Sequence, residues 1–330
     1  MSGSGHELVV LATGQQLCYD VDGAEVPCRG TRQDGELRPG LGWPAERFRE
    51  GGGRVLDRLT GLEWTRCANP CEWPMPVDEA PAAIAELNRR GYCGCSDWRL
   101  PGRAELRSLT SFASRNPALP AGHPFTDVYL SWYWTATPSA RNPEYAWYVH
   151  LEGARTFFGH RREDHLVWPC RGSSRVIPVD GATRVDGRGR FDVAGSVVRD
   201  RATGLEWTRD ADLARGTVRW EEALALVRRL DRRAVPAGSG WRLPTVNELD
   251  SLVDLGRWEP ALPSPHPFAG VRDAYWSSTS SAYEPDWAMA LYLDLGRVGV
   301  GQKKDANFSV WAVRSPGTRG RCDPRRSTPG

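Results

Sequence analysis

The chain is organised around the stretch Trp98-Arg99-Leu100-Pro101-Gly102-Arg103-Ala104-Glu105-Leu106. It occurs a second time as Trp241-Arg242-Leu243-Pro244-Thr245-Val246-Asn247-Glu248-Leu249. Each copy is typical of a strand end that runs into a helix, since proline is tolerated in a first turn and Thr-x-x-Glu forms a capping box. An unpaired charge beside Trp and Leu would be costly, so we predict that each Arg pairs with the Glu of its own copy. We therefore assign a structural, not a catalytic, role to Trp98, Arg99, Glu105, Trp241, Arg242 and Glu248.

The rest of the chain repeats with this stretch at a nearly constant spacing. Thr60-Gly61-Leu62-Glu63-Trp64 returns as Thr203-Gly204-Leu205-Glu206-Trp207, and Val167-Trp168 returns as Val310-Trp311. Matching motifs in the same order indicate tandem duplication. The predicted organisation is a disulfide-tied, turn-rich leader at 1–53, a first module at 54–172, a linker with the strand that leads into the second module at 173–197, the second module at 198–315, and a loose tail at 316–330.

Within each copy the apolar pattern changes from helical to alternating. Ala80, Ile84 and Leu87 have helical spacing, whereas Trp147 and Val149 alternate with other residues as in a strand. The sequence thus predicts an α+β class, with two helices followed by a curled antiparallel sheet in each module. Because residues 189–316 contain no cysteine and every repeated motif, we expect that fragment to fold alone.

Composition excludes several classes of protein. A net charge of +2 over 330 residues gives no global field to attract nucleic acid or an anionic membrane. No run of 18 apolar residues is present, so no membrane span is predicted. The start, Met1-Ser2-Gly3-Ser4-Gly5, resembles a cloning scar, and we expect that a signal peptide has been removed ahead of it.

The cysteines favour an oxidising compartment. Six of the eight lie before residue 100, a pattern more typical of disulfides than of isolated core thiols. Asp22-Gly23 predicts a hairpin, and a Cys18–Cys28 bridge across it would stabilise the leader by roughly 2 to 3 kcal/mol. Bridges in an undetermined pairing are expected among Cys67, Cys71, Cys93 and Cys95, with Cys170 and Cys322 paired or free. Zinc is the rival interpretation, although Cys-x-Cys matches structural zinc spacing poorly.

The ordered motifs carry a resemblance. Thr-Gly-Leu-x-Trp, Trp-Arg-Leu-Pro-x-x-x-Glu-Leu, Leu-Pro-x-x-x-Pro-Phe, Tyr-Trp and Val-Trp-x-x-Arg, each present twice, resemble the bacterial domain family typified by the C-terminal domain of the Legionella collagen-like adhesin. The resemblance implies two tandem C-type-lectin-like modules, an extracytoplasmic location (periplasmic, cell surface or secreted) and ligand or surface binding. It supplies no catalytic residues.

Metal and catalytic motifs are weak. The run from His160 to His165 offers two imidazoles and two carboxylates, but its counterpart from Gln302 to Asn307 has no His. No cofactor is predicted. The alternative is calcium at loop carboxylates, with Glu144, Glu152, Asp286 and Asp294 as the candidate ligands. The Gly-x-Ser-x-Gly, His-Glu-x-x-His and Gly-rich phosphate-binding patterns are missing, so the chain is predicted not to be an enzyme. The enzyme alternative is thiol chemistry at Cys93 and Cys95, related to formylglycine-generating proteins.

Tryptophan is the clearest excess, with 15 in the chain. Eight fall into repeated pairs and are expected in the core, whereas unpaired aromatic residues in the later part of each copy are free to serve recognition. Flat rings beside cationic donors suit a sugar that bears carboxylate or sulfate, or an acidic protein patch. The candidate ligand-binding residues are Trp132, Tyr145, Trp147, Arg161, Arg162, Tyr283, Trp287, Tyr292, Lys303 and Lys304. The sequence predicts a secreted or periplasmic protein that binds a glycan or a surface protein; the alternative is a protein–protein interaction subunit of a cell-envelope assembly.

Overall fold

A computed structural model of the chain describes residues 9–174, 176, 189–234 and 240–315. Part of the expected linker 173–197 and all of the expected tail 316–330 lie outside the described residues, as does Cys322.

The fold is mainly β, with 28% of residues in strands and 15% in helices, and the described residues form four antiparallel sheets. The predicted α+β class, with two helices and one curled sheet in each C-type-lectin-like module, is therefore wrong. The second helix of each repeat is only six residues long in α3 (Arg103–Ser108) and five in α5 (Val246–Asp250). In addition, the strands of each repeat divide between two sheets, because the first three strands and the last one form a small sheet and the three strands between them pair separately.

Each repeat builds one small four-stranded sheet from its two ends. In the first repeat the strand order is β3-β4-β5-β9, with β3 (Phe48–Gly51), β4 (Arg54–Asp57), β5 (Glu63–Thr65) and β9 (Cys170–Arg171). In the second it is β10-β11-β12-β16, with β10 (Phe191–Ala194), β11 (Val197–Asp200), β12 (Glu206–Thr208) and β16 (Val313–Arg314). The end of the leader thus supplies β3 to the first module's sheet.

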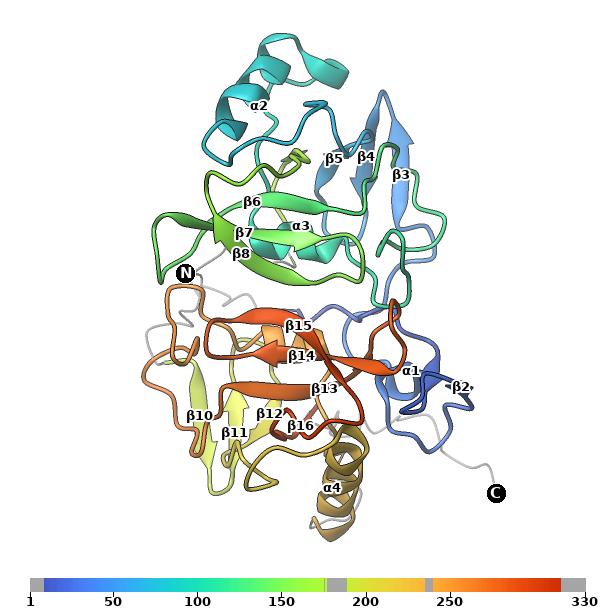
Figure 1. Cartoon of the computed structure of the whole chain (residues 1–330), viewed down its shortest axis with the longest axis vertical. Helices are drawn as coiled ribbons and strands as arrows, with labels where there is room; N and C mark the ends of the chain where they lie inside the picture. Colours follow the sequence, from blue (N-terminus) through green and yellow to red (C-terminus); the bar gives the residue numbers. More distant parts are fainter. Residues whose placement is uncertain (1–8, 175, 177–188, 235–239, 316–330) are drawn as a thin grey trace, which may run out of the picture.

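The middle strands of both repeats join into one six-stranded sheet, which we call the joint sheet (Figure 1). Its order is β13-β14-β15-β8-β7-β6, made of β6 (Trp132–Pro138), β7 (Tyr145–His150), β8 (Thr156–His160), β13 (Ala274–Ser280), β14 (Trp287–Tyr292) and β15 (Arg297–Gln302). The two modules meet where Val298 of β15 pairs with Thr156 of β8. The repeats are therefore parts of one continuous sheet.

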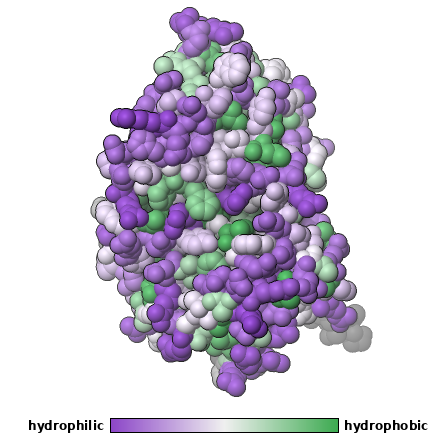
Figure 2. All heavy atoms as spheres, viewed as in Figure 1, coloured by the Kyte–Doolittle hydropathy of each residue, from purple (hydrophilic) through white to green (hydrophobic). Residues whose placement is uncertain are grey.

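The helices leave one face of the joint sheet open in its middle. α3 and α5 pack behind the sheet, while α2 (Ala80–Arg89) and α4 (Trp220–Arg233) lie towards opposite ends of the molecule (Figure 1). A 3₁₀ turn, η1 (Tyr92–Gly94), follows α2. In the same view, apolar and weakly polar surface gathers over the middle of the molecule (Figure 2). No helix among the described residues is long and apolar enough to cross a membrane.

The eight paired tryptophans lie in the core, as predicted, and the most exposed of them, Trp241, retains 5% of its accessible surface. Buried indoles need partners for their N–H groups, and Trp168 donates to Thr65 O at 3.0 Å while Trp311 donates to Thr208 O at 2.9 Å. The clusters around them are not confined to one module, because Phe112 and Ala154 of the first pack with the core of the second.

The repeated stretch forms the predicted ion pairs. Arg99 donates to Glu105 at 2.7 and 2.6 Å, and Arg242 Nη1 donates to Glu248 Oε2 at 2.6 Å. Glu248 also caps α5, since it accepts from Thr245 N at 2.9 Å while its own N–H donates to Thr245 Oγ1 at 3.2 Å. One carboxylate thus neutralises a guanidinium and satisfies a helix N-terminus.

A second repeated ion pair was not predicted from the sequence. Arg47 binds Asp57 at 3.0 and 2.8 Å, and Arg190 binds Asp200 at 2.8 and 2.7 Å. All four side chains are buried. Each guanidinium also donates to a carbonyl at the end of α3 or α5, so the pair ties a small sheet to a helix behind the joint sheet.

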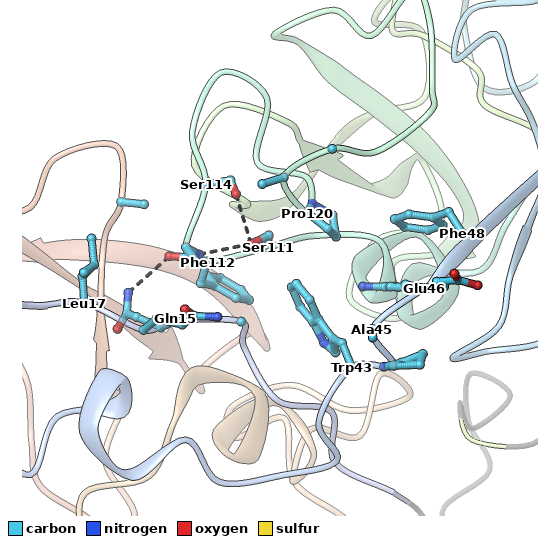
Figure 3. Close-up of a pocket in the computed structure, with 18 of the residues that line it drawn as sticks. Gln15, Leu17, Trp43, Ala45, Glu46, Phe48, Ser111, Phe112, Ser114 and Pro120 are labelled. Atoms are coloured by element: carbon cyan, nitrogen blue, oxygen red, sulfur yellow. Dashed lines mark hydrogen bonds between the residues drawn. The ribbon is translucent and has the colours of Figure 1, made fainter.

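The leader is a hairpin of β1 (Cys18–Tyr19) and β2 (Glu25–Val26) followed by the short helix α1 (Asp34–Leu37), and it carries the predicted Cys18–Cys28 disulfide. It packs on the second module, where Lys303 Nζ donates to Tyr19 O, Asp20 O and Pro285 O at 3.2, 3.1 and 2.7 Å. Its later part runs beside the first module, where Trp43 stands near the loop that holds Phe112 (Figure 3).

Candidate functional site

Strand alternation assigns the side chains of the joint sheet to two faces. Tyr133 and Val149 face α3 in the buried core, and Met289 and Leu291 face α5 in the same way. The neighbouring positions therefore point to the opposite face. Four half-buried aromatic residues lie on that face across the middle of the joint sheet, and we call them the aromatic band: Trp132, Tyr148, Phe157 and Tyr292.

The rings of the aromatic band lie close to one another. The centroid of Trp132 is 4.4 Å from that of Tyr148 and 5.9 Å from that of Phe157. Gly299 lies between Phe157 and Tyr292, because a Cβ atom there would come within 3.2 Å of Phe157 and 2.9 Å of Tyr292. The absence of a side chain at this position lets the two rings approach the strand. The band thus continues from the first module into the second.

Two arginine–carboxylate pairs flank the band at equivalent hairpin turns. Arg155 lies 3.7 Å from Glu152, and Arg297 lies 3.1 Å from Asp294. The guanidinium of Arg297 is also 5.4 Å from the ring centroid of Tyr292, which is a cation–π contact. Its buried Nε–H has no hydrogen-bond partner among the described residues. Since a guanidinium carries five N–H donors, each pair retains donors for a ligand.

His150 lies beneath the edge of the band. Its ring is 4.3 Å from Trp132, and its Nδ1 lies 3.1 Å from Glu152 O. Burial lowers the pKa of His150 below its ordinary value, so the ring is neutral at pH 7. Burial likewise raises the pKa of Tyr148 to about 12, which keeps its hydroxyl protonated. The charge beside the band therefore comes from the two arginine–carboxylate pairs and from the carboxylate of Glu163, which lies near Tyr148.

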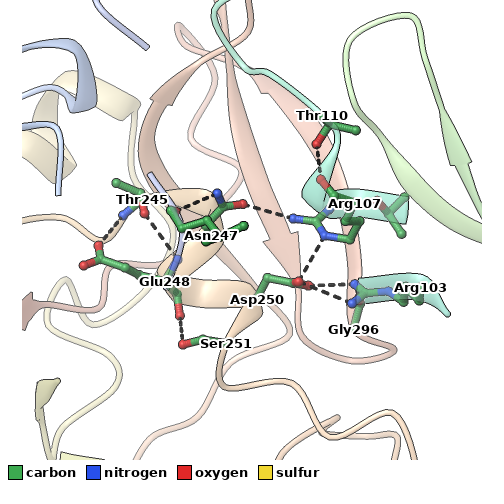
Figure 4. Close-up of polar contacts among 11 residues, drawn as sticks. Arg103, Arg107, Thr110, Thr245, Asn247, Glu248, Asp250, Ser251 and Gly296 are labelled. Atoms are coloured by element: carbon green, nitrogen blue, oxygen red, sulfur yellow. Dashed lines mark hydrogen bonds and ion pairs between the residues drawn. The ribbon is translucent and has the colours of Figure 1, made fainter. Parts of the chain in front are cut away.

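A buried ionic cluster behind the sheet fixes one module against the other (Figure 4). Asp250 of α5 lies 2.7 Å from Arg103 and 3.1 Å from Arg107, both of α3. Arg107 also donates to Thr156 of β8 at 2.8 Å. Although burial opposes ionisation, the two guanidiniums lower the pKa of Asp250; burial lowers the pKa of Arg107 to about 10. The cluster holds both halves of the aromatic band in one orientation.

The ten predicted ligand-binding residues do not form one site. Only Trp132 and Tyr292 belong to the aromatic band. Trp147 and Lys303 are buried, at 2% and 0% exposure, so they are not available for surface recognition. Trp147 lies behind the joint sheet with Arg103 4.7 Å from its ring.

The other six lie at separate places. In the first module, Tyr145 packs against Phe158 and His160, Arg161 pairs with Asp78, and Arg162 is exposed. In the second module, Tyr283 approaches Gly153, Trp287 begins β14, and Lys304 pairs with Asp22. Tyr148, Phe157, Arg155 and Arg297 were not predicted from the sequence. Alternation alone would have placed them with Trp132 and Tyr292, but it does not say which face stays open.

Four cysteines, Cys67, Cys71, Cys93 and Cys95, differ from the prediction, whereas a free Cys170 is one of the two outcomes expected for it. Cys67, Cys71, Cys93, Cys95 and Cys170 are free thiols in the structure, so the expected bridges among the first four are not formed. The sulfurs of the Cys-x-Cys pair contact other groups, since Arg54 donates to Cys95 Sγ at 2.7 Å and Cys93 Sγ lies 3.3 Å from Gly53 O. Burial raises the pKa of Cys67 and of Cys71 to about 11, which disfavours the nucleophilic thiolate.

Within the described part of the chain, no three His, Cys, Asp or Glu side chains are grouped as a metal site would need. In the His160–His165 turn, His165 Nε2 lies 3.2 Å from Glu163, and burial lowers the pKa of His165. The described residues thus do not bring the sequence's metal-ligand candidates together.

Comparison with protein families gives a match over most of the chain. The family described as Lcl C-terminal domain matches residues 53–171 and again residues 196–314. The two matches coincide with the two repeats and contain three strands of each small four-stranded sheet, while the first strands, β3 and β10, lie just before them. A search of curated proteins found no match.

Proposed function

Because the chain belongs to the Lcl C-terminal domain family, as a tandem repeat of that domain, we propose that it binds a carbohydrate of the bacterial surroundings on the aromatic band. The family suggests a bacterial surface or adhesin-like ligand-binding protein, and it is not an enzyme family. The Cys18–Cys28 disulfide and the lack of a spanning helix among the described residues fit an extracytoplasmic protein. The carbohydrate and the site are the new parts of the proposal.

The observation that supports the site is the continuity of the band across both modules. Aromatic rings on an open sheet face bind the apolar faces of sugar rings at little entropic cost, because they are already ordered. Arg155 and Arg297 stand at equivalent turns beside those rings and donate to hydroxyl or oxyanion groups. A polysaccharide that bears sulfate or carboxylate groups satisfies both the rings and the arginines.

The test compares three polymers: dextran, dextran sulfate and hyaluronan. We expect immobilised dextran sulfate or hyaluronan to capture the protein more tightly than dextran, with affinity that falls as salt is raised. Trp132→Leu should weaken capture at least tenfold, because it removes a ring but retains an apolar side chain. The double variant Arg155→Gln/Arg297→Gln should remove most of the preference for charged polymers.

Trp258→Leu is the matched control. Trp258 is 46% exposed and lies outside the aromatic band, so its replacement should leave capture unchanged. Thermal unfolding of each variant shows whether it is folded. Wild-type capture by a folded Trp132→Leu protein would exclude the band as the binding site.

A further inference from the structure

A cavity lies away from the aromatic band, between the leader and the first module (Figure 3). Its volume is about 780 Å³, within the range of small-molecule sites. Leader residues 14–19 and 43–50 form one wall, the loop 111–124 forms the other, and Ala282 is contributed by the second module. None of its lining residues belongs to the aromatic band, so the two surfaces are testable separately.

Aromatic rings from both walls line this cavity: Trp43, Phe48 and Phe112. The ring of Trp43 is fixed, because its Nε1–H donates to Ala12 O at 3.1 Å. Gly14 has φ of +85°, and a Cβ atom there would lie 2.4 Å from the Trp43 ring. A glycine at this position therefore leaves room for the indole, which stands as a preformed wall.

The polar groups of the cavity include carboxylate and hydroxyl oxygens, besides the side-chain amides of Gln15 and Gln16. Glu46 and Glu50 each bind an outward arginine through Oε2, at 3.1 Å in both cases. Their Oε1 atoms have no hydrogen bond among the described residues. Ser111 and Ser114 face each other across 3.4 Å on the opposite wall. Acceptors of this kind favour a ligand that is rich in hydrogen-bond donors.

Charge narrows the ligand class further. The two carboxylates at the rim disfavour an anion. A cation near the rings would be repelled by the positive charge of Arg47, whose guanidinium lies 4.9 Å from the centroids of both Trp43 and Phe48. Arg47 does not turn away to make space, because it is buried and paired with Asp57 at 2.8 Å. A neutral ligand with an apolar ring face and several hydroxyl groups fits both conditions.

We propose that the cavity between Trp43, Glu46 and Ser114 is a second binding site, and that it takes a neutral saccharide. The rings stack on the sugar face, and the carboxylate and hydroxyl oxygens accept its hydroxyl protons. This site is independent of the proposed function at the aromatic band. The two sites have opposite ligand preferences, because the cavity disfavours a ligand with sulfate or carboxylate groups and the aromatic band favours one.

Saturation-transfer NMR on the full chain tests the proposal with matched sugars: methyl glucoside, maltose and cellobiose as neutral probes, glucuronate as an anion and glucosamine as a cation. We expect at least one neutral probe to bind, and both charged probes to bind at least tenfold more weakly. Binding of no neutral probe, or equal binding of a charged one, would overturn the proposal.

A blocking variant locates the site without removing native contacts. Ala113 is an exposed residue of the cavity wall, so Ala113→Trp should fill the hollow and weaken neutral-sugar binding at least tenfold. Ala140→Trp, on an exposed turn outside the cavity, is the matched control and should bind as the wild type does. Unchanged sugar binding in Ala113→Trp would place the ligand elsewhere.

The same variants separate this proposal from the first. Ala113→Trp should leave dextran sulfate capture intact, and Trp132→Leu should leave neutral-sugar binding intact. If the wild-type protein fails to bind one of the two ligand classes, only the proposal for the corresponding surface is contradicted.

Discussion

Asp34 is a buried carboxylate whose charge is poorly compensated. Its Oδ2 accepts from Thr13 Oγ1 and from Thr279 Oγ1, both at 2.7 Å, and its Oδ1 has no partner among the described residues. Burial raises the pKa of Asp34 to about 6 from an ordinary 3.8, despite the two hydroxyl donors. The folded state therefore holds this proton more tightly than the unfolded state does.

The stability of the protein should fall as the pH rises from about 4 to about 6. Below about pH 4 the group is protonated in both states; between 4 and 6 only the folded state retains the proton, so the free energy of unfolding decreases by up to about 3 kcal/mol. Asp34→Asn should flatten this slope and raise stability at pH 7, as measured by urea unfolding at several pH values. Asp22→Asn, at an exposed leader residue, is the control. An unchanged slope in Asp34→Asn would contradict the assignment.

At the residue scale, local pairings were predictable and distant ones were not. The Arg99–Glu105 and Arg242–Glu248 pairs lie within one motif, so burial beside Trp and Leu was sufficient to predict them. Arg47–Asp57 joins the leader to the first repeat, and the repeat was taken to begin after Arg47. Extending the repeat back to the matching Arg47 and Arg190 would have revealed the second pair.

At the scale of elements, α3 and α5 are too short to be held by their own hydrogen bonds, and their contact depends on the Asp250 cluster. Asp250→Asn would remove the buried carboxylate that lies 2.7 Å from Arg103 and 3.1 Å from Arg107. We expect the free energy of unfolding to drop by about 3 to 5 kcal/mol in chemical denaturation.

Asp192→Asn provides the comparison for this loss. Asp192 lies 3.7 Å from Arg201 and its side chain is 64% exposed, so its loss should cost less than about 1 kcal/mol. Similar small costs for both variants would mean that the cluster does not hold α3 against α5.

The spacing of apolar residues predicted the type of some helices and strands but not their length or their neighbours. Helical spacing correctly indicated α2 and α4, but it did not show that α3 and α5 would be single turns or that strands would dominate. Alternation indicated strands in the later part of each repeat. It did not identify their neighbours, because the same pattern is satisfied by pairing within a copy or between copies.

At the scale of the whole molecule, the modules share a core. Phe112, Ala118 and Ala154 of the first module pack with the core of the second, and Val298 pairs with Thr156 across the junction. The sequence predicted that residues 189–316 fold alone, but these contacts lead us to the opposite expectation. The isolated fragment should unfold at a temperature lower by about 10 °C or more, without a sharp transition.

Calorimetry of the fragment beside the full chain makes this comparison. A cooperative transition of the fragment at the full-chain temperature would show that the shared contacts are dispensable. The joint sheet could not be predicted from the sequence, because the duplication indicates two copies but does not indicate whether strands of one copy pair with strands of the other.

The pairing of β15 with β8 also has a consequence for solubility. Both are outermost strands of their own three-stranded sets, β13-β14-β15 and β6-β7-β8. In a chain with one copy, such a strand would present unpaired N–H and C=O groups to any other chain, which invites edge-to-edge aggregation. In the tandem arrangement, the two edge strands β8 and β15 pair with each other, so neither is exposed to another chain. A protein with a single copy would need another way to protect that strand, and the simplest is to pair it with the same strand of a second molecule.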